Sequence, residues 1–337
     1  MITREIRLAA PVTGEPGPGH FTVAETEVDG EVDGEVDGEV TVRTDYVGLA
    51  ATYLELMRAD CRIPVPAWQP GDRVGAAVVG TVVRSGSPDL AVGDLVQSMT
   101  GWSEYSAGPA AQYVKLDRGL FPDPSYHLGQ GVTAYYGMAD VAAVGEGDVV
   151  FVSGAAGGVG SLAGQIARCR GAARVIGSAG SPAKAAYLVD ELGYDAAFDY
   201  HDGPVADRLR ELAPEGITVF FDVVGGEQYD AAVRAARPGA RFALCGSLSH
   251  QLGGDADRFP EPDRAAAGAR GIELLPFSCH HTPEQVAAWR EHFARWLAEG
   301  RFVFPQTVVE GGIEQVPGAF LSLLKGSYRG NVAVRLA

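Results

Sequence analysis

The sequence predicts a two-part α/β protein: a β-rich region and a doubly wound parallel sheet. Its 337 residues are enough for two domains. Residues 1–122 contain short apolar runs separated by Gly, Pro and Asp, which is typical of β-rich structure. From about residue 145, strand-like runs alternate with helix-like segments, which indicates parallel strands joined by helices. Strand-like runs return at 303–337. We therefore expect one domain at 1–122 with 303–337 and a second at 123–302.

In the first domain, strand-like runs lie at 40–42, 73–83 and 95–99. The sequences PGD at 70–72 and VGD at 92–94 indicate turns that lead into strands.

The second domain has six expected strands, at 148–153, 174–177, 196–200, 219–224, 241–245 and 272–277. Ser181 followed by Pro182 indicates a helix start, and Gly193 ends that helix.

A further helix is expected where Thr282 and Gln285 have capping-box spacing. Its aromatic residues, Trp289, Phe293 and Trp296, recur at helical spacing. We expect them to pack against the domain rather than to bind a ligand.

A glycine-rich segment, SGAAGGVG at 153–160, follows an expected strand and opens an expected helix. Its spacing GxxGxxG is a variant of the dinucleotide-binding fingerprint of the Rossmann fold. Glycines let the backbone approach a pyrophosphate, and a helix N-terminus offers N–H groups and a positive dipole end. We therefore expect the cofactor phosphates to lie at Gly154, Ala156, Gly157, Gly158, Val159 and Gly160.

The end of the next strand favours NADPH over NADH. An NAD site places Asp or Glu about 20 residues after the fingerprint, but the sequence here is GSAGS at 177–181. Lys184 follows in the first turn of the next helix, in a chain that has lysine elsewhere only at 115 and 325. We expect Ser178, Gly180 and Lys184 to recognise the 2′-phosphate.

Charge and cysteine content indicate which classes of partner and which compartment suit the protein. The net charge of −16 argues against nucleic acids and anionic membranes. The four cysteines, at 61, 169, 245 and 279, lack CxxC spacing, which fits a reducing compartment. Because neither a signal peptide nor a membrane-length apolar run is present, we expect a cytoplasmic protein.

Residues 27–40 repeat EVDG and carry seven carboxylates. A calcium loop would need Glu at its twelfth position, but counting from Asp29 gives Val40 and counting from Asp33 gives Thr44. We expect a solvated acidic edge or hairpin.

Five motifs are long enough to compare with a known family. They are GVTAYYG at 131–137, VSGAAGGVGS at 152–161, KAAYLVDELGYDAAFDY at 184–200, GITVFFDVVGG at 216–226 and ALCGSLS at 243–249. They resemble the prostaglandin reductase and 2-alkenal reductase branch of the zinc-independent medium-chain dehydrogenases/reductases, and weaker similarity covers most of the chain. The resemblance implies a GroES-like β domain, a Rossmann domain that binds NADPH, and a homodimer.

The resemblance also implies cofactor contacts. Lys184 and Tyr200 would contact the 2′-phosphate. The remaining expected contacts are Val223, Cys245, Gly246 and Ser247.

The implied reaction is reduction of the carbon–carbon double bond of an enone or enal. A hydrogen-bond donor would stabilise the charge that develops on the carbonyl oxygen. Three positions depart from the family: Val223 and Tyr328 replace Asn, and Gln251 replaces Tyr. We expect Tyr328, His250 or Tyr53 to supply the donor.

Zinc-dependent members carry a GHE motif and a four-cysteine lobe. The corresponding stretch here is GAA at 75–77, and the cysteines are not clustered, so we expect no metal site. His280 and His281 are adjacent, and we expect a solvent-facing pair rather than metal ligands.

Four functions stay open for a small-molecule substrate: an enone or enal reductase, a reductase of one specialised biosynthetic intermediate, an NADPH quinone oxidoreductase, and a cofactor-binding protein with little catalysis. The altered positions 223, 251 and 328 keep the second and the fourth open.

Overall fold

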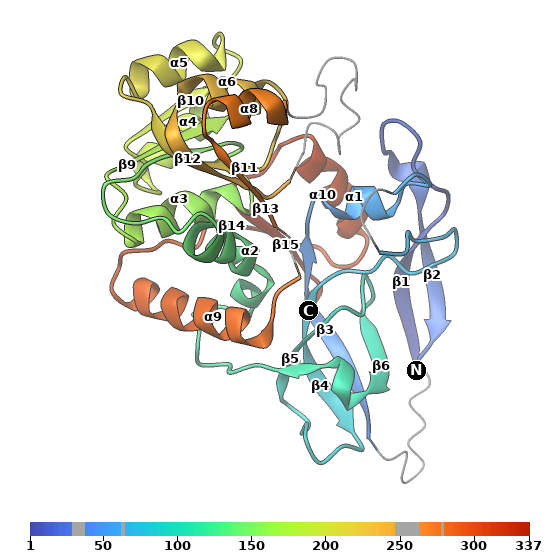
Figure 1. Cartoon of the computed structure of the whole chain (residues 1–337). Helices are drawn as coiled ribbons and strands as arrows, with labels where there is room; N and C mark the ends of the chain where they lie inside the picture. The colour runs from blue at the N-terminus through green and yellow to red at the C-terminus, as the bar shows by residue number, and fades with distance from the viewer. Residues whose placement is uncertain (29–37, 62–64, 247–262, 278–279) are drawn as a thin grey trace. The chain divides into compact units, whose positions relative to one another are not determined.

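The computed structural model describes residues 1–28, 38–61, 65–246, 263–277 and 280–337 (Figure 1). It divides into two compact units: unit 1 is Met1–Gly129 with Gln306–Ala337, and unit 2 is Gln130–Pro305. Both divisions lie a few residues beyond the expected 122 and 302. Residues 123–129 were expected in the second domain but belong to unit 1. There the Ser125 hydroxyl donates to the side chain of Gln306, also in unit 1, at 3.1 Å.

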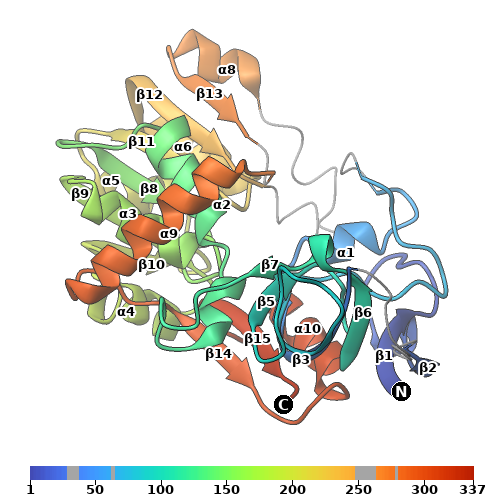
Figure 2. The same ribbon diagram turned by 90° about the horizontal axis from the view of Figure 1, so that it is seen from below.

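Unit 1 is the β-rich unit. Its larger sheet has the order β14-β15-β3-β4-β5-β7, with β6 paired to β3, and Figure 2 shows the strands around β3 curving into a ring. A separate antiparallel pair, β1 with β2, lies beside it. The elements are β1 (Ile2–Leu8), β2 (Phe21–Glu27), β3 (Glu39–Leu49), α1 (Tyr53–Leu56), β4 (Val78–Ser85), β5 (Leu95–Ser98), β6 (Tyr105–Pro109), β7 (Val114–Lys115), β14 (Gln306–Val309), α10 (Gln315–Leu324) and β15 (Asn331–Arg335).

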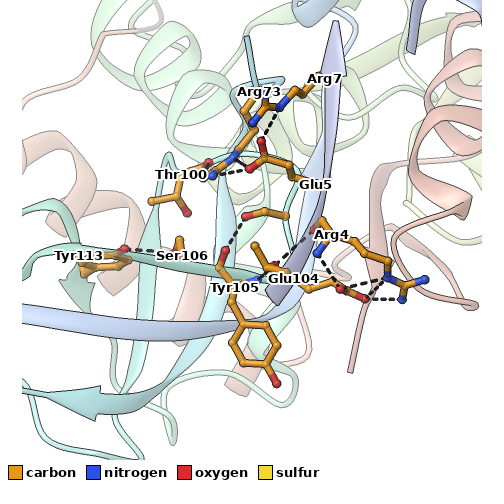
Figure 3. Close-up of polar contacts among 11 residues, drawn as sticks. Arg4, Glu5, Arg7, Arg73, Thr100, Glu104, Tyr105, Ser106 and Tyr113 are labelled. Carbon is orange, nitrogen blue, oxygen red and sulfur yellow. Dashed lines mark hydrogen bonds and ion pairs between the residues drawn. The ribbon is translucent and has the colours of Figure 1, made fainter. Parts of the chain in front are cut away.

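Ion pairs attach β1 to the rest of unit 1. The Glu5 carboxylate is almost fully buried and pairs with Arg7 and Arg73 (Figure 3). Burial opposes its ionisation, but the two guanidinium groups hold the pKa of Glu5 below its usual range. One residue earlier, Arg4 pairs with Glu104. The buried Glu5 carboxylate therefore has two cationic partners, which offset the cost of burying its charge.

Two expectations for unit 1 were wrong. The strand expected at 73–83 begins only at Val78, and Arg73 instead pairs with Glu5. The tail is not strands alone, because α10 lies between β14 and β15. Pro317 and Gly318 disguise this helix in the sequence, but Pro317 lies in the first helical turn, where its missing N–H leaves no bond unmade.

Unit 2 is a six-stranded, wholly parallel sheet with the order β10-β9-β8-β11-β12-β13. This is the strand order of the dinucleotide-binding Rossmann fold, so the predicted fold class is confirmed. The strands are β8 (Val149–Val152), β9 (Arg174–Ala179), β10 (Ala196–Asp199), β11 (Ile217–Asp222), β12 (Ala236–Leu244) and β13 (Glu273–Pro276). The helices are α2 (Gly131–Tyr136), α3 (Gly160–Cys169), α4 (Pro182–Asp190), α5 (Val205–Leu212), α6 (Glu227–Ala235), α8 (Arg264–Ala269) and α9 (Pro283–Ala298).

A row of aromatic rings crosses one face of this sheet. Phe151 of β8 stacks on Phe198 and Phe220, and Phe220 packs edge-on against Phe242. These rings share a buried cluster with apolar residues of α5, α6 and α8. In Figure 1, α5 and α6 lie on one side of the strands, and α3 and α9 on the other. Helices on both faces explain why the strands read as continuous apolar runs.

The α9 aromatics pack as expected, since Trp289, Phe293 and Trp296 are all buried.

The expectation of a solvent-facing histidine pair was wrong for one member. His280 is exposed, but His281 is partly buried, with its ring 2.9 Å from the Thr133 hydroxyl and against the Tyr136 ring.

Over the described ranges, every helix is too short or too polar to cross a membrane.

Candidate cofactor and active site

The glycine-rich turn connects β8 to α3. Gly154 adopts φ +58°, and its carbonyl accepts a hydrogen bond from the Gly157 amide at 3.0 Å. The chain therefore reverses within a few residues, and α3 begins at Gly160. This positive φ favours glycine, because a side chain there would be strained.

The turn has little space for side chains. A Cβ built on Gly160 would lie 2.5 Å from the Gly154 carbonyl oxygen and 2.8 Å from the Ala155 Cα. A Cβ on Gly158 would lie 3.1 Å from the Gln130 side chain. Backbone atoms thus form the surface of the turn, as close approach of a phosphate requires.

Three amides of this turn suit an anion. Within the described ranges, the N–H groups of Ala156, Val159 and Gly160 have no hydrogen-bond partner. All three precede or open α3, a helix of ten residues. A helix N-terminus combines such donors with the positive end of the helix dipole. Three of the six expected phosphate contacts therefore offer donors that suit a pyrophosphate, whereas the Gly157 amide already donates to Gly154.

The turn also lies where a parallel sheet binds ligands. β8 and β11 are neighbours, yet the chain runs from β8 to β9 on one side and reaches β11 only after β10. The strand order thus reverses between β8 and β11, and ligands bind at the carboxyl ends of strands at such a switch point.

A buried hydrogen-bond network, not predicted from the sequence, joins these two strand ends. The Ser153 hydroxyl donates to the Asp222 carboxylate at 2.9 Å and accepts from the Val223 amide at 2.8 Å. Asp222 also accepts from the amides of Val224 at 3.1 Å and Gly225 at 2.8 Å. The only signal in the sequence was a Ser directly after one apolar strand and an Asp as the last residue of another.

Asp222 connects the network to a third strand. Its carbonyl accepts from the amides of Cys245 at 2.9 Å and Gly246 at 3.1 Å, just beyond β12. Three expected cofactor contacts, Val223, Cys245 and Gly246, are thus held around one residue. Burial raises the pKa of the Asp222 carboxyl to about 6, although its three hydrogen bonds oppose that rise.

The structure gives Ser178 a different role from the expected phosphate contact. Its side chain is fully buried, and the hydroxyl donates to Gln228 of α6. Its carbonyl accepts from the Ala155 amide at 2.8 Å. Ser178 therefore stabilises the glycine-rich turn through its carbonyl, and its hydroxyl bonds Gln228 rather than a ligand.

The other expected 2′-phosphate residues gather at the carboxyl ends of β9 and β10. A Cβ built on Gly180 would lie 3.4 Å from the Tyr200 ring, and that tyrosine is 40% exposed. The Ser181 hydroxyl caps α4 by accepting from the Lys184 amide at 3.3 Å. Burial raises the pKa of the Tyr200 phenol, so it keeps a proton to donate.

Two of the donor candidates, Tyr53 and Tyr328, lie in unit 1 and pack against the same apolar cluster. The Tyr53 hydroxyl accepts a hydrogen bond from the Ala77 amide at 3.2 Å. Burial raises the pKa of the Tyr53 phenol. This hydroxyl is therefore protonated at neutral pH, and its own hydrogen is available to donate.

Some expectations lie outside the described residues. They concern the donor candidate His250, the altered position Gln251, the cofactor contact Ser247, Cys279 and most of the EVDG repeat.

The stretch expected at the zinc position, 75–77, has no ligating side chain. Ala76 is buried, and the Gly75 backbone packs against Trp68. In the described part of the chain, no group of three or more His, Cys, Asp or Glu could hold a metal ion.

Comparison with known proteins agrees with this site. The model of the zinc-binding dehydrogenases matches residues 158–278, and that of the N-terminal domain of oxidoreductases matches 4–116. NADPH-dependent curcumin reductase of Escherichia coli is 31% identical over 98% of this chain and 96% of its own. Prostaglandin reductase 1 of Mus musculus is 33% identical, with 81% and 84% covered. The NADP⁺-dependent 2-alkenal reductase of Nicotiana tabacum is 32% identical, with 81% and 80% covered.

Solved structures give the same result. CurA from Vibrio vulnificus, 29% identical, superimposes over 99% of both chains with a TM-score of 0.90. The structure of CurA in complex with NADPH has a TM-score of 0.89 over the same coverage. The chain therefore belongs to the medium-chain dehydrogenase/reductase superfamily, in the zinc-independent branch of the prostaglandin, 2-alkenal and curcumin reductases.

Proposed function

We propose that this protein is an NADPH-dependent reductase of the carbon–carbon double bond of α,β-unsaturated carbonyl compounds. The glycine-rich turn carries the proposal, because it offers the amides of Ala156, Val159 and Gly160 at a switch point. Relatives named for the reduction of curcumin, prostaglandins and 2-alkenals support the substrate class.

The strand ends that read the ribose support NADPH as the cofactor. No carboxylate follows β9, where an Asp or Glu would bind a 2′-hydroxyl and repel a phosphate. Instead, Gly180 and Tyr200 lie together, with Lys184 in the first turn of α4. A cation, a phenolic donor and a helix N-terminus all favour a dianion.

NADPH, when bound, supplies a hydride to the β-carbon of the substrate. The glycine-rich turn and the Ser153–Asp222 network hold the cofactor half of the site in place. We propose that the Tyr53 hydroxyl donates a hydrogen bond to the substrate carbonyl oxygen as negative charge develops there. Its position beside Ala77 supports this role, since zinc-dependent relatives carry metal ligands at that stretch.

The departures at Val223 and Tyr328 support a substrate that differs from those of the relatives, such as a single biosynthetic intermediate. Both positions carry Asn in the family and lie around the nicotinamide and substrate there. Val223 donates its backbone amide to Ser153, and its apolar side chain cannot make the hydrogen bonds of an asparagine amide.

We also propose a homodimer in the cytoplasm. β13 is an edge strand and, of the described strands, pairs with β12 alone, so its other side can pair with a second copy. Cysteines without paired spacing support a reducing compartment.

The test follows the loss of reduced-nicotinamide absorbance with NADPH and with NADH, against a panel of enals, enones and quinones. With an enone, we expect NADPH to be oxidised at least about tenfold faster than NADH. Charge-assisted contacts to the 2′-phosphate raise the affinity for NADPH by about this factor or more. Turnover of quinones alone would favour a quinone oxidoreductase. Tight NADPH binding without turnover of any compound would favour a cofactor-binding protein.

A further inference from the structure

His201 directly follows Tyr200 beyond β10 and is held in one orientation. Its ring Nδ1 lies 2.8 Å from the Asp199 carboxylate, which also accepts from the His201 amide at 3.1 Å. Asp199 is buried, whereas the His201 side chain is 60% exposed. A histidine whose Nδ1 donates to a buried carboxylate presents its other nitrogen, Nε2, to its surroundings.

The His201 ring lies at the carboxyl ends of β9 and β10, where we expect the ribose of the cofactor to bind. Asp199 is in register with Ala179, the last residue of β9, and the Tyr200 amide donates to the Ala179 carbonyl at 3.0 Å. The Tyr200 ring lies against Gly180, and the His201 ring centroid is 4.1 Å from the Tyr200 ring centroid. In this fold the ribose 2′ position is recognised at the end of the second strand, which here is β9.

The charge around this ring suits a phosphate only when the ring is protonated. The titratable groups next to it in the chain are Asp199, Tyr200 and Asp202. Lys184 lies in the first turn of α4, the helix that packs against β10. In the doubly protonated ring, Nδ1 donates to the Asp199 carboxylate, which offsets one positive charge. Nε2 then carries a hydrogen that a phosphate oxygen can accept in a charge-assisted bond.

We propose that His201 contacts the 2′-phosphate of NADPH through Nε2, and that it strengthens the preference for NADPH over NADH. This inference rests on the proposed function, because it assumes that a phosphorylated dinucleotide binds at the carboxyl ends of β9 and β10. It adds to Lys184 and Tyr200 a contact whose charge depends on pH.

The experiment measures binding of NADP⁺ and NAD⁺ by titration calorimetry, at pH 6.5 and pH 8.5. The informative variant is His201→Asn, because the asparagine amide nitrogen can replace Nδ1 at Asp199 but nothing replaces Nε2. We expect its Kd for NADP⁺ at pH 6.5 to rise about three- to tenfold over the parent protein, with the Kd for NAD⁺ unchanged. At pH 8.5 the difference should shrink, because a neutral imidazole cannot make the charge-assisted bond to the phosphate.

His201→Lys is the matched rescue, because it restores a cation at the same position. We expect it to keep tight NADP⁺ binding at both pH values. Equal losses of NADP⁺ and NAD⁺ binding in His201→Asn would show a purely structural role and overturn the inference, as would unchanged binding of both. If the parent protein bound no NADP⁺, the proposed function itself would fail, which is a separate result.

Discussion

The hydroxyl of Tyr53 accepts one hydrogen bond from the Ala77 amide and has one hydrogen left to donate. Burial raises its pKa, so the phenol is not ionised near neutrality. A hydroxyl of this kind stabilises an oxyanion without giving up its proton in the resting state. Tyr328 packs against the same apolar cluster of unit 1 as Tyr53 and also carries a phenolic hydroxyl that can donate.

Tyr53→Phe removes the hydroxyl and leaves the ring that packs against Trp68. We expect kcat with an enone to fall on the order of 100-fold, because one oxyanion donor contributes about this factor, and the Kd for NADPH to stay the same. Steady-state kinetics and cofactor titration measure both. Tyr113→Phe is the matched control, since its hydroxyl bonds only Ser106 among the described residues. If Tyr328→Phe lost kcat and Tyr53→Phe did not, the donor would be Tyr328.

Asp222 is a buried carboxyl at the centre of the cofactor half. Its pKa of about 6 lies above the ordinary 3.8 because burial disfavours the charged form. Its contribution to folding stability is therefore fully present below pH 3.8 and is lost as the pH rises through 6. Two units of pKa correspond to roughly 3 kcal/mol.

Asp222→Asn tests this sign, because an amide keeps an oxygen acceptor for Ser153 but does not ionise. We expect the free energy of unfolding of the parent protein, relative to this variant, to decrease by roughly 3 kcal/mol between pH 4 and pH 7. Urea denaturation at a series of pH values measures the difference. Asp207→Asn, an exposed carboxylate on α5, should show no such trend. A difference that grew with pH would contradict the account.

At the scale of elements, the start of α3 depends on close backbone contact. Gly160 faces the carbonyl of Gly154 and the Cα of Ala155, which are backbone atoms and cannot rotate away. The Tyr194 hydroxyl also donates to the Gly160 carbonyl at 2.7 Å, which fixes this point to the core of unit 2. A methyl group here must therefore displace the turn itself.

Gly160→Ala should weaken NADPH binding about tenfold or more, because overpacking of this size costs about 1–3 kcal/mol and moves the phosphate-binding amides. Fluorescence titration with NADPH measures it. Gly145→Ala is the matched control, since a Cβ there meets nothing within 4 Å and the residue has no positive φ. Equal binding by the two variants would show that the turn tolerates the shift.

At the scale of the whole molecule, the edge strand β13 is where a strand of a second chain can pair with the parallel sheet. Its backbone pairs with β12 on one side, and Leu274 and Leu275 are only partly buried. A strand with one free side among the described strands favours pairing with another strand. We expect sedimentation velocity at micromolar concentration to give the mass of two chains. A single-chain mass across that range would rule out the proposed homodimer.

The sequence by itself determined the fold class, the six strands of unit 2 and the position of the glycine-rich turn. These features are local, because apolar runs, helix caps and glycine spacing are written in neighbouring residues. The helix α10 was missed because Pro317 and Gly318 are read locally as breakers, whereas packing of Val316 and Phe320 stabilises it.

Only the tertiary structure decided how distant residues combine. Ser153 and Asp222 are 69 residues apart in the chain, and their hydrogen bond exists because β8 and β11 are neighbours in the sheet. In the same way, pairing of β9 with β10 brings Tyr200 to Gly180 and places His201 beside them. Ser178 appeared from the sequence to face a phosphate, but burial beneath α6 gives it Gln228 instead. Strand order is a non-local property, so no local pattern could have revealed these contacts.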